Sequence, residues 1–323
     1  MTKPGEQCTA PRIRGKSRFE SIGAQMLEQF GAQRPLRAGS LIVTVFGDIV
    51  AVRGGVVWMG SLIQLLKPFG LSERLVRTAV HRLVGEGWLE SRRVGRRSYY
   101  RLSADGSARF DVAARKIYGP PQTRWDGRWS LIQILRSPAA GRERLKRELG
   151  WLGYTTIGPG LMASPGPDRD AISALRNGDN GARIIDWIAT PGGPGTPEPL
   201  RRLLERGLAL AEVGTRYAEF VDRFAAVDIA SSRLRVLPSD AALLTRILLI
   251  HEYRRIVLRD PRLPLELWPT AWPAQQAFEL CGRIYRRLCP ASEAWLDRNL
   301  PIAPGHLPVA DGGPAGRFAG AGQ

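Results

Sequence analysis

The chain has 323 residues, 44% of them hydrophobic, which is enough for two or three domain cores rather than one. Its 47 Lys and Arg against 30 Asp and Glu give a formal net charge of +17, which favours a polyanionic partner. The three cysteines have no CxxC spacing, and with only three histidines the sequence offers neither a zinc site nor a disulfide framework. No run approaches the roughly 18 apolar residues that span a bilayer, so we expect a cytoplasmic protein without a membrane partner.

Composition divides the chain into three blocks between two polar tails. We expect residues 1–35 to form a disordered basic tail and residues 303–323, which are rich in glycine, to form another. The first block ends at a hinge-like Tyr-Gly-Pro-Pro-Gln-Thr run at 118–123, and the second ends at a Pro- and Gly-rich run at 191–197.

The first block begins with a strongly apolar helix, Ser40–Val50, in which Asp48 is the only charge. A short helix over 61–66 is then expected to end at Pro68 and Gly70. Ser72 begins the next helix, which extends to Glu86, because its hydroxyl can cap the first turn. The order helix, tight turn, helix is typical of a helix-turn-helix.

The helix from Ser72 has two different faces. Val76, Val80 and Leu83 fall on an apolar stripe that suits a core. The opposite face can place arginine on guanine edges in a major groove. Its predicted DNA-binding residues, with the capping serine, are Ser72, Arg74, Arg77, Thr78, His81 and Arg82.

A basic hairpin is predicted next, over Trp88–Leu102, as two short strands around a glycine-containing turn. From Ser72 to Arg101 eight arginines stand against three glutamates, which suits phosphates or a minor groove. The predicted contacts from this wing are Arg92, Arg93, Arg96, Arg97 and Ser98. The alternative interpretation is that helix and hairpin are only a solvated basic face.

The second block alternates predicted strands and helices, which indicates a small α+β domain of the ferredoxin-like kind. The expected order is strand, helix, strand, helix, strand, over 129–135, 141–152, 154–163, 168–176 and 184–189. The third block is helical, with helices expected over 200–224, from an N-cap at Ser239 to Leu258, and over 274–288 and 291–299.

Several motifs carry a resemblance to a known family. In the first block these are Ser40–Asp48, Arg53-Gly54-Gly55, Leu71–Val80 and Gly95–Tyr100. Further motifs follow at Tyr118–Pro121, Trp125–Trp129, Leu149–Gly153, His251–Arg255 and Leu258–Pro261. Together they resemble the PaaX family of bacterial repressors of phenylacetate catabolism, and the similarity covers roughly Leu36 to Leu300.

The resemblance implies an α+β, multidomain protein. Its parts would be a winged helix-turn-helix over 36–112, a Cas2-like, ferredoxin-like domain over 120–191 and a helical C-terminal domain over 197–302. It implies a homodimer on a palindromic operator in double-stranded DNA, no cofactor, and release from DNA by phenylacetyl-CoA or a related acyl-CoA. A family member that senses another acyl-CoA or controls another aromatic pathway is equally compatible with these motifs.

For this effector, one group of residues offers cations for CoA phosphates and aromatic surface for an aryl group. It consists of His251, Tyr253, Arg254, Arg255 and Trp268. The alternative is that these arginines simply pair with neighbouring carboxylates.

Two rival functions remain. Cas2-like folds include metal-dependent nucleases, yet the expected strand 129–136 contains no carboxylate and Asp126 lies before it, so we expect no enzyme and no metal. The other rival is a nonspecific scaffold for RNA or another polyanion.

Overall fold

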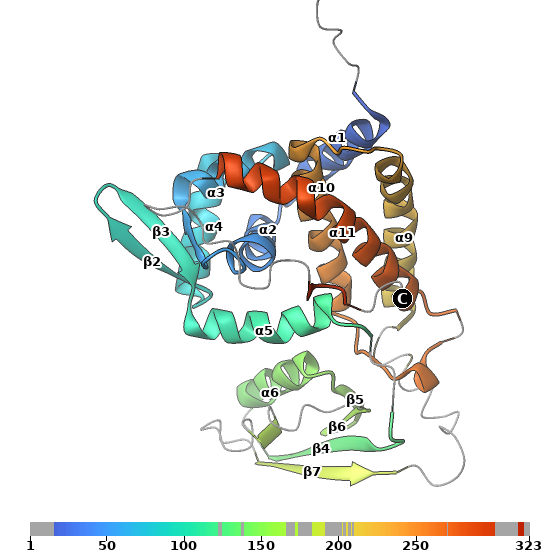
Figure 1. Ribbon diagram of the computed structural model, residues 1–323. Helices are drawn as coiled ribbons and strands as arrows, with labels where there is room; N and C mark the ends of the chain where they lie inside the picture. Colours follow the sequence, from blue (N-terminus) through green and yellow to red (C-terminus); the bar gives the residue numbers. More distant parts are fainter. Residues whose placement is uncertain are drawn as a thin grey trace, which may run out of the picture.

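The computed structural model describes residues 16–121, 125–136, 139–165, 172–173, 183–190, 202, 205, 208, 210–269, 271–300 and 316–319. Within these residues the chain combines α-helices with two small antiparallel sheets, which confirms the α+β expectation (Figure 1). The three-stranded sheet belongs to the first block, and the four-stranded sheet belongs to the second.

The first described element is helix α1, Arg18–Gly31, so the expected disordered tail over 1–35 is wrong for these residues. Ser17 and Glu20 form a capping box, which satisfies two free amides of the first turn. Phe19, Met26 and Phe30 are buried, and α1 packs against two helices of the third block. The surrounding sequence is polar, but these contacts bury the apolar side chains of α1 and so stabilise the helix. Residues 1–15 lie outside the described residues.

The predicted helix, turn and helix are present. Helix α2, Ala38–Val45, continues into a π-helical turn η1, Phe46–Val50. After strand β1, Val56–Trp58, come helix α3, Met59–Leu66, a 3-10 turn η2, Lys67–Phe69, and helix α4, Glu73–Gly85. Gly70 has φ 77°, a backbone conformation that glycine adopts without steric cost, and it turns the chain toward α4. As predicted, Ser72 is the N-cap, and its side chain accepts a hydrogen bond from the amide of Leu75.

The basic hairpin is also present, as strands β2, Leu89–Val94, and β3, Arg97–Leu102. Strand β1 joins it on the other edge of β3, a pairing that the sequence did not indicate. Helix α5, Ala104–Tyr118, follows with Ser103 as its N-cap and carries the chain to the second sheet (Figure 1).

The second sheet contains strands β4, Trp129–Arg136, β5, Thr155–Gly158, β6, Leu161–Ser164, and β7, Arg183–Ala189, in the order β5-β6-β4-β7. The stretch expected as one extended segment over 154–163 is a hairpin instead, because Gly160, with φ 71°, turns the chain back. Helix α6, Ala139–Trp151, buries Leu145 and Leu149 against the sheet. Of the helix expected over 168–176, only residues 172 and 173 lie in the described part.

The third block contributes helices α9, Leu210–Ser232, α10, Ser239–Val257, and α11, Ala274–Asn299, with a 3-10 turn η3, Leu265–Leu267. The two helices expected over 274–288 and 291–299 are one. Pro290 removes one backbone donor, but residues on both sides of it, such as Leu288 and Leu296, are buried on the same packed face. Pro238 rather than Ser239 is the N-cap of α10.

The first and third blocks share one hydrophobic core. A single cluster of buried residues runs from Leu41 and Phe46 of the α2 region to Leu249 of α10 and Phe278 of α11. The same cluster contains Phe318, so the disordered tail expected over 303–323 is wrong for residues 316–319. Helix α2 and η1, which precede α4 in the chain, therefore pack directly against the C-terminal helices.

Candidate nucleic-acid interface and buried polar cluster

Helix α4 presents a polar face that matches the prediction. Val76, Ala79, Val80 and Leu83 are buried in the core. The predicted contact residues on the other side are all exposed, namely Ser72, Arg74, Arg77, Thr78, His81 and Arg82. This face of the helix is therefore open to solvent.

Two of these arginines pair with glutamates, Arg77 with Glu73 of the same helix and Arg82 with Glu86, the C-cap of the helix. Arg77 donates to Glu73 through Nε and Nη2 at 2.9 and 2.7 Å, and Nε of Arg82 lies 3.4 Å from Glu86. Such exposed pairs contribute little, so phosphate or a base edge can replace the carboxylate. Arg74 has no side-chain partner among the described residues and is the cation most directly available.

The hairpin adds a second cationic surface beside α4. Arg92, Arg93, Arg96 and Arg97 are exposed, whereas Ser98 is half-buried. The guanidinium of Arg97 lies 4.9 Å from the ring centroid of Trp58, which fixes its direction. Figure 1 shows the hairpin protruding on the side of the molecule where α4 lies, opposite α9. The cationic face of α4 and the arginine hairpin therefore lie on the same side of the molecule.

The five residues predicted for the effector do not surround one space. His251 and Arg254 face α2, where Nδ1 of His251 is 3.0 Å from the Thr44 hydroxyl and Arg254 donates to the Ser40 carbonyl at 2.8 Å. Arg255 instead lines an open cavity of about 620 Å³ beside α9. Tyr253 and Trp268 line a second, small pocket.

Burial lowers the pKa of both residues that face α2. Burial first, and the neighbouring Arg254 and Arg255 second, lower the pKa of His251 to about 3, so this imidazole is neutral at physiological pH. Burial also lowers the pKa of Arg254, to about 10. These two side chains fasten α10 to α2, a structural role that the sequence did not distinguish from ligand binding.

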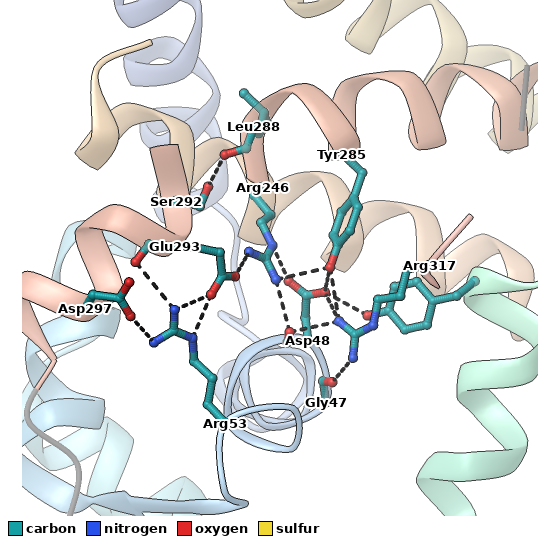
Figure 2. A network of polar contacts seen from close by, with 11 residues as sticks. Gly47, Asp48, Arg53, Arg246, Tyr285, Leu288, Ser292, Glu293, Asp297 and Arg317 are labelled. Carbon is teal, nitrogen blue, oxygen red and sulfur yellow. Dashed lines mark hydrogen bonds and ion pairs between the residues drawn. The ribbon is translucent and has the colours of Figure 1, made fainter. Parts of the chain in front are cut away.

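A cluster of buried charged side chains, which the sequence did not predict, lies where η1 meets α10 and α11 (Figure 2). The carboxylate of Asp48, in η1, accepts hydrogen bonds from Nε of Arg246 at 2.8 Å and from Nη1 of Arg317 at 2.6 Å. The hydroxyls of Tyr118 and Tyr285 each donate to its Oδ1 at 2.9 Å. Burial alone would raise the pKa of Asp48, but the two guanidinium groups and the two hydroxyls lower it, so the group is ionised.

The cluster extends to the surface through α11. Glu293 accepts from both Arg246 and Arg53, and Nη1 of Arg53 donates to Asp297 at 2.7 Å (Figure 2). Arg53 belongs to the Arg-Gly-Gly turn before β1, so the chain leading to α3 and α4 is tied to α11. We call Asp48, Arg53, Arg246, Tyr285, Glu293, Asp297, Arg317 and Tyr118 the junction cluster.

One sequence signal pointed to this cluster. Asp48 is the only charge among eleven residues that are otherwise suited to a core, and a buried carboxylate requires a partner. That partner, Arg246, is 198 residues away and is the only charge among residues 241–250. Nothing in the sequence alone pairs the two.

The described residues contain neither a metal-binding cluster nor a membrane-spanning helix. They contain no group of three or more His, Cys, Asp or Glu that could hold a metal ion. No helix in this part of the chain is both long and apolar enough to cross a membrane.

Known proteins share the sequence over most of its length. A profile of the PaaX-like protein family matches residues 37–106, and one of the PaaX-like protein C-terminal domain matches 208–298. The chain is 36% identical over 277 residues to a protein named transcriptional repressor PaaX from Escherichia coli (strain K12), covering 85% of this chain and 88% of that protein. Among solved structures, the uncharacterized protein Rv0674 from Mycobacterium tuberculosis has a TM-score of 0.46 and 23% identity, over 73% of this chain and 89% of that one. The sequence similarity to the Escherichia coli protein over nearly the whole length shows that this chain belongs to the PaaX family.

Proposed function

We propose that the protein is a DNA-binding transcriptional repressor of an operon for aromatic, phenylacetate catabolism, and that an aryl-acyl-CoA such as phenylacetyl-CoA releases it from DNA. The observation that carries this proposal is the exposed arginine face of α4 beside the arginine hairpin. The name of the Escherichia coli relative, transcriptional repressor PaaX, supports the regulatory role.

In this proposal residues 36–112 act as a winged helix-turn-helix. The N-terminal half of α4 enters a major groove, where arginine can bind guanine O6 and N7 in a bidentate manner. Arg96 and Arg97, at the tip of the hairpin, reach the adjacent minor groove or its phosphates. Two copies, as a homodimer, would contact two half-sites of a palindromic operator, because a two-fold symmetric protein matches a two-fold symmetric sequence.

The middle of the chain fits a ferredoxin-like, Cas2-like domain without catalysis. The strand order β5-β6-β4-β7, with all neighbours antiparallel, supports this arrangement. Strand β4 carries no carboxylate to hold a metal, and Asp126 before it accepts a hydrogen bond from the Arg128 amide at 2.9 Å. These features support a regulatory domain rather than a nuclease.

The repressor role can be tested by fluorescence anisotropy with two duplexes, the promoter of the adjacent catabolic operon and a shuffled sequence of equal length. We expect Arg77→Ala and Arg82→Ala to reduce the preference for the promoter at least tenfold, since each bidentate pair contributes about 1–3 kcal/mol of discrimination. Arg233→Ala is the matched control, because Arg233 is exposed and directly follows α9, a helix that lies across the molecule from the hairpin (Figure 1). A preference that both α4 variants retain would contradict the proposal and favour a nonspecific polyanion binder.

The effector can be identified in the same assay by titrating the promoter complex with phenylacetyl-CoA, free phenylacetate and benzoyl-CoA. We expect only phenylacetyl-CoA to release the DNA. Release by benzoyl-CoA alone would instead indicate a family member that controls another aromatic pathway.

Incubation with Mg²⁺ or Mn²⁺ and labelled nucleic acid tests catalysis, and cleavage that survives repurification would contradict the regulatory assignment of the middle domain.

A further inference from the structure

One aromatic side chain near the C-terminus is completely enclosed by aromatic rings from the rest of the protein. Phe318 is 0% exposed. Its ring centroid lies 5.2 Å from Tyr285, 5.4 Å from Tyr118, 5.6 Å from Phe278 and 6.0 Å from Tyr253. These four residues, which we call the aromatic cage, come from α5, α10 and α11.

The segment that carries Phe318 inserts two side chains, Phe318 into the cage and Arg317 into the junction cluster. Gly316 and Ala319 are exposed. The amide of Phe318 donates to the Tyr118 carbonyl at 3.0 Å, and Arg286 donates to the Phe318 carbonyl at 3.2 Å. Phe318 has φ 58°, in the left-handed region that is unfavourable for a bulky residue. The segment thus holds one benzyl group in the cage at the expense of its own backbone conformation.

We propose that the aromatic cage is the binding site for the aryl group of the effector, and that Phe318 occupies it when the effector is absent. The side chain of phenylalanine is a benzyl group. A phenylacetyl ligand carries the same benzyl group on its carbonyl carbon, so a cage that encloses one accommodates the other. The identity of this ligand rests on the proposed function, whereas the capacity of the cage for a benzyl group rests on its geometry.

The residue next to Phe318 connects the cage to the junction cluster. Nη1 of Arg317 donates to the backbone carbonyl of Asp48 at 2.8 Å and to its carboxylate at 2.6 Å, and Nη2 donates to the Gly47 carbonyl at 2.9 Å (Figure 2). A ligand that displaces Phe318 also withdraws Arg317 from η1. Since η1 follows α2 directly, displacement weakens the attachment of the DNA-contacting segment to α10 and α11. A ligand can shift a conformational equilibrium only through such a difference in contacts.

The competing explanation is that Phe318 is simply part of the core. The two explanations differ in the affinity of the cage for a free arene. We would measure binding of phenylacetamide and phenylacetyl-CoA to the full chain by calorimetry, for the wild type and for Phe318→Ala. If Phe318 competes with the ligand, Phe318→Ala should bind both at least tenfold more tightly and should release promoter DNA at a correspondingly lower concentration of phenylacetyl-CoA.

A buried phenyl ring away from the cage provides the control. Phe69 of η2 is also 0% exposed and packs against Phe30. Phe69→Ala should leave both affinities within twofold of the wild type. Equal affinity of Phe318→Ala and the wild type, or equal gains in both variants, would overturn the cage as the effector site.

A second measurement does not depend on Phe318→Ala being well folded. Arg317→Ala keeps Phe318 but removes the contacts of its neighbour to Gly47 and Asp48, and should tighten phenylacetamide binding by a few fold. Unchanged affinity in this variant would count against the competition. If phenylacetyl-CoA releases DNA while these affinities stay equal, the cage is wrong and the proposed function stands. If it releases no DNA while the affinities differ as expected, the cage stands and the proposed effector role fails.

Discussion

The carboxylate of Asp48 and the guanidinium of Arg246 form an ion pair in which neither side chain is exposed, with 2.8 Å between Oδ2 and Nε. The pair joins η1 to α10 across 198 residues of sequence. Removing two charges from water is costly, and the pair is tolerable only because further donors and acceptors satisfy both groups. Tyr285 supplies one of these, since its hydroxyl donates to Asp48 and accepts from Arg246 at 3.1 Å.

We therefore expect Asp48→Ala to destabilise the protein strongly. The substitution removes the carboxylate partner of Arg317 and one of the two carboxylate partners of Arg246, whose other partner is Glu293. Breaking a buried pair from one side costs about 3–5 kcal/mol. Urea unfolding followed by circular dichroism would measure this loss. Asp297→Ala is the control, because Asp297 belongs to the same cluster but its side chain is 58% exposed, and it should cost about 1 kcal/mol or less. A loss below about 1 kcal/mol for Asp48→Ala would contradict the assignment of the cluster as the attachment point.

His251 predicts a pH dependence of stability. Its pKa is about 3 in the folded protein, because of burial first and of Arg254 and Arg255 second, against about 6.5 in an unfolded chain. Below pH 6.5 the unfolded chain gains a proton that the folded protein excludes, so stability falls as the pH falls. The loss is about 1.4 kcal/mol per pH unit, or about 2 kcal/mol at pH 5 relative to neutral pH.

This dependence can be separated from that of the carboxylates by comparison with His251→Asn, in which an amide can still face the Thr44 hydroxyl. Urea unfolding at pH 7.5 and pH 5.0 should show a smaller pH-induced loss in the variant by about 2 kcal/mol. The same loss in both proteins would mean that the imidazole is not held neutral.

The salt dependence of DNA binding tests the hairpin. If Arg96 and Arg97 both contact phosphate, replacing them together with alanine should flatten the slope of log affinity against log salt concentration by about two units. Anisotropy titrations between about 50 and 200 mM salt cover the necessary range. Arg233→Ala should leave the slope unchanged. An unaltered slope in the double variant would remove the hairpin tip from the interface.

Two glycines allow a sharper test of the connection between hairpin and α5. A Cβ at Gly106 would lie 2.2 Å from the Trp88 carbonyl oxygen, which already accepts a hydrogen bond from the Ser103 amide. Because this neighbour is backbone, Gly106→Ala should destabilise the protein by about 1–3 kcal/mol. At Gly85, the last residue of α4, a Cβ meets nothing within 4 Å, and Gly85→Ala should stabilise by up to about 1 kcal/mol. Thermal unfolding that ranks the two variants in the opposite order would refute this packing.

Local signals predicted the DNA-contacting part of the fold well. Ser72 as a cap, Gly70 as a turn and the alternation of buried and exposed residues in α4 are features that neighbouring residues decide. The exposed positions of the arginines followed from the same periodicity. All but one of the predicted contact residues of helix and hairpin are exposed, and Ser98 is half-buried.

What the sequence did not predict depends on long-range packing. Phe19 and Phe318 lie in polar surroundings that suggest disorder, yet both are buried because distant helices provide their apolar neighbours. Pro290 suggested a helix boundary, but α11 continues through it because α11 packs against α9 and α10. The sequence around Pro290 gives no sign of that packing. Side-chain chemistry alone also could not place the predicted effector residues, because His251 and Arg254 face α2 whereas Tyr253 lies in the aromatic cage.

The shared core also limits how a protein of this kind acquires a new operator sequence. A cut near residue 112 would expose Leu41 and Phe46 to water, so the segment that contains α4 is not a cassette that can be exchanged intact between relatives. Substitutions at Arg74, Thr78 and His81 disturb no buried contact, since these side chains lie on the exposed face of the helix. We therefore expect binding specificity to diverge by single substitutions on this face. The buried surfaces that pack the α4-containing segment against the C-terminal helices can change only through coordinated substitutions on both sides.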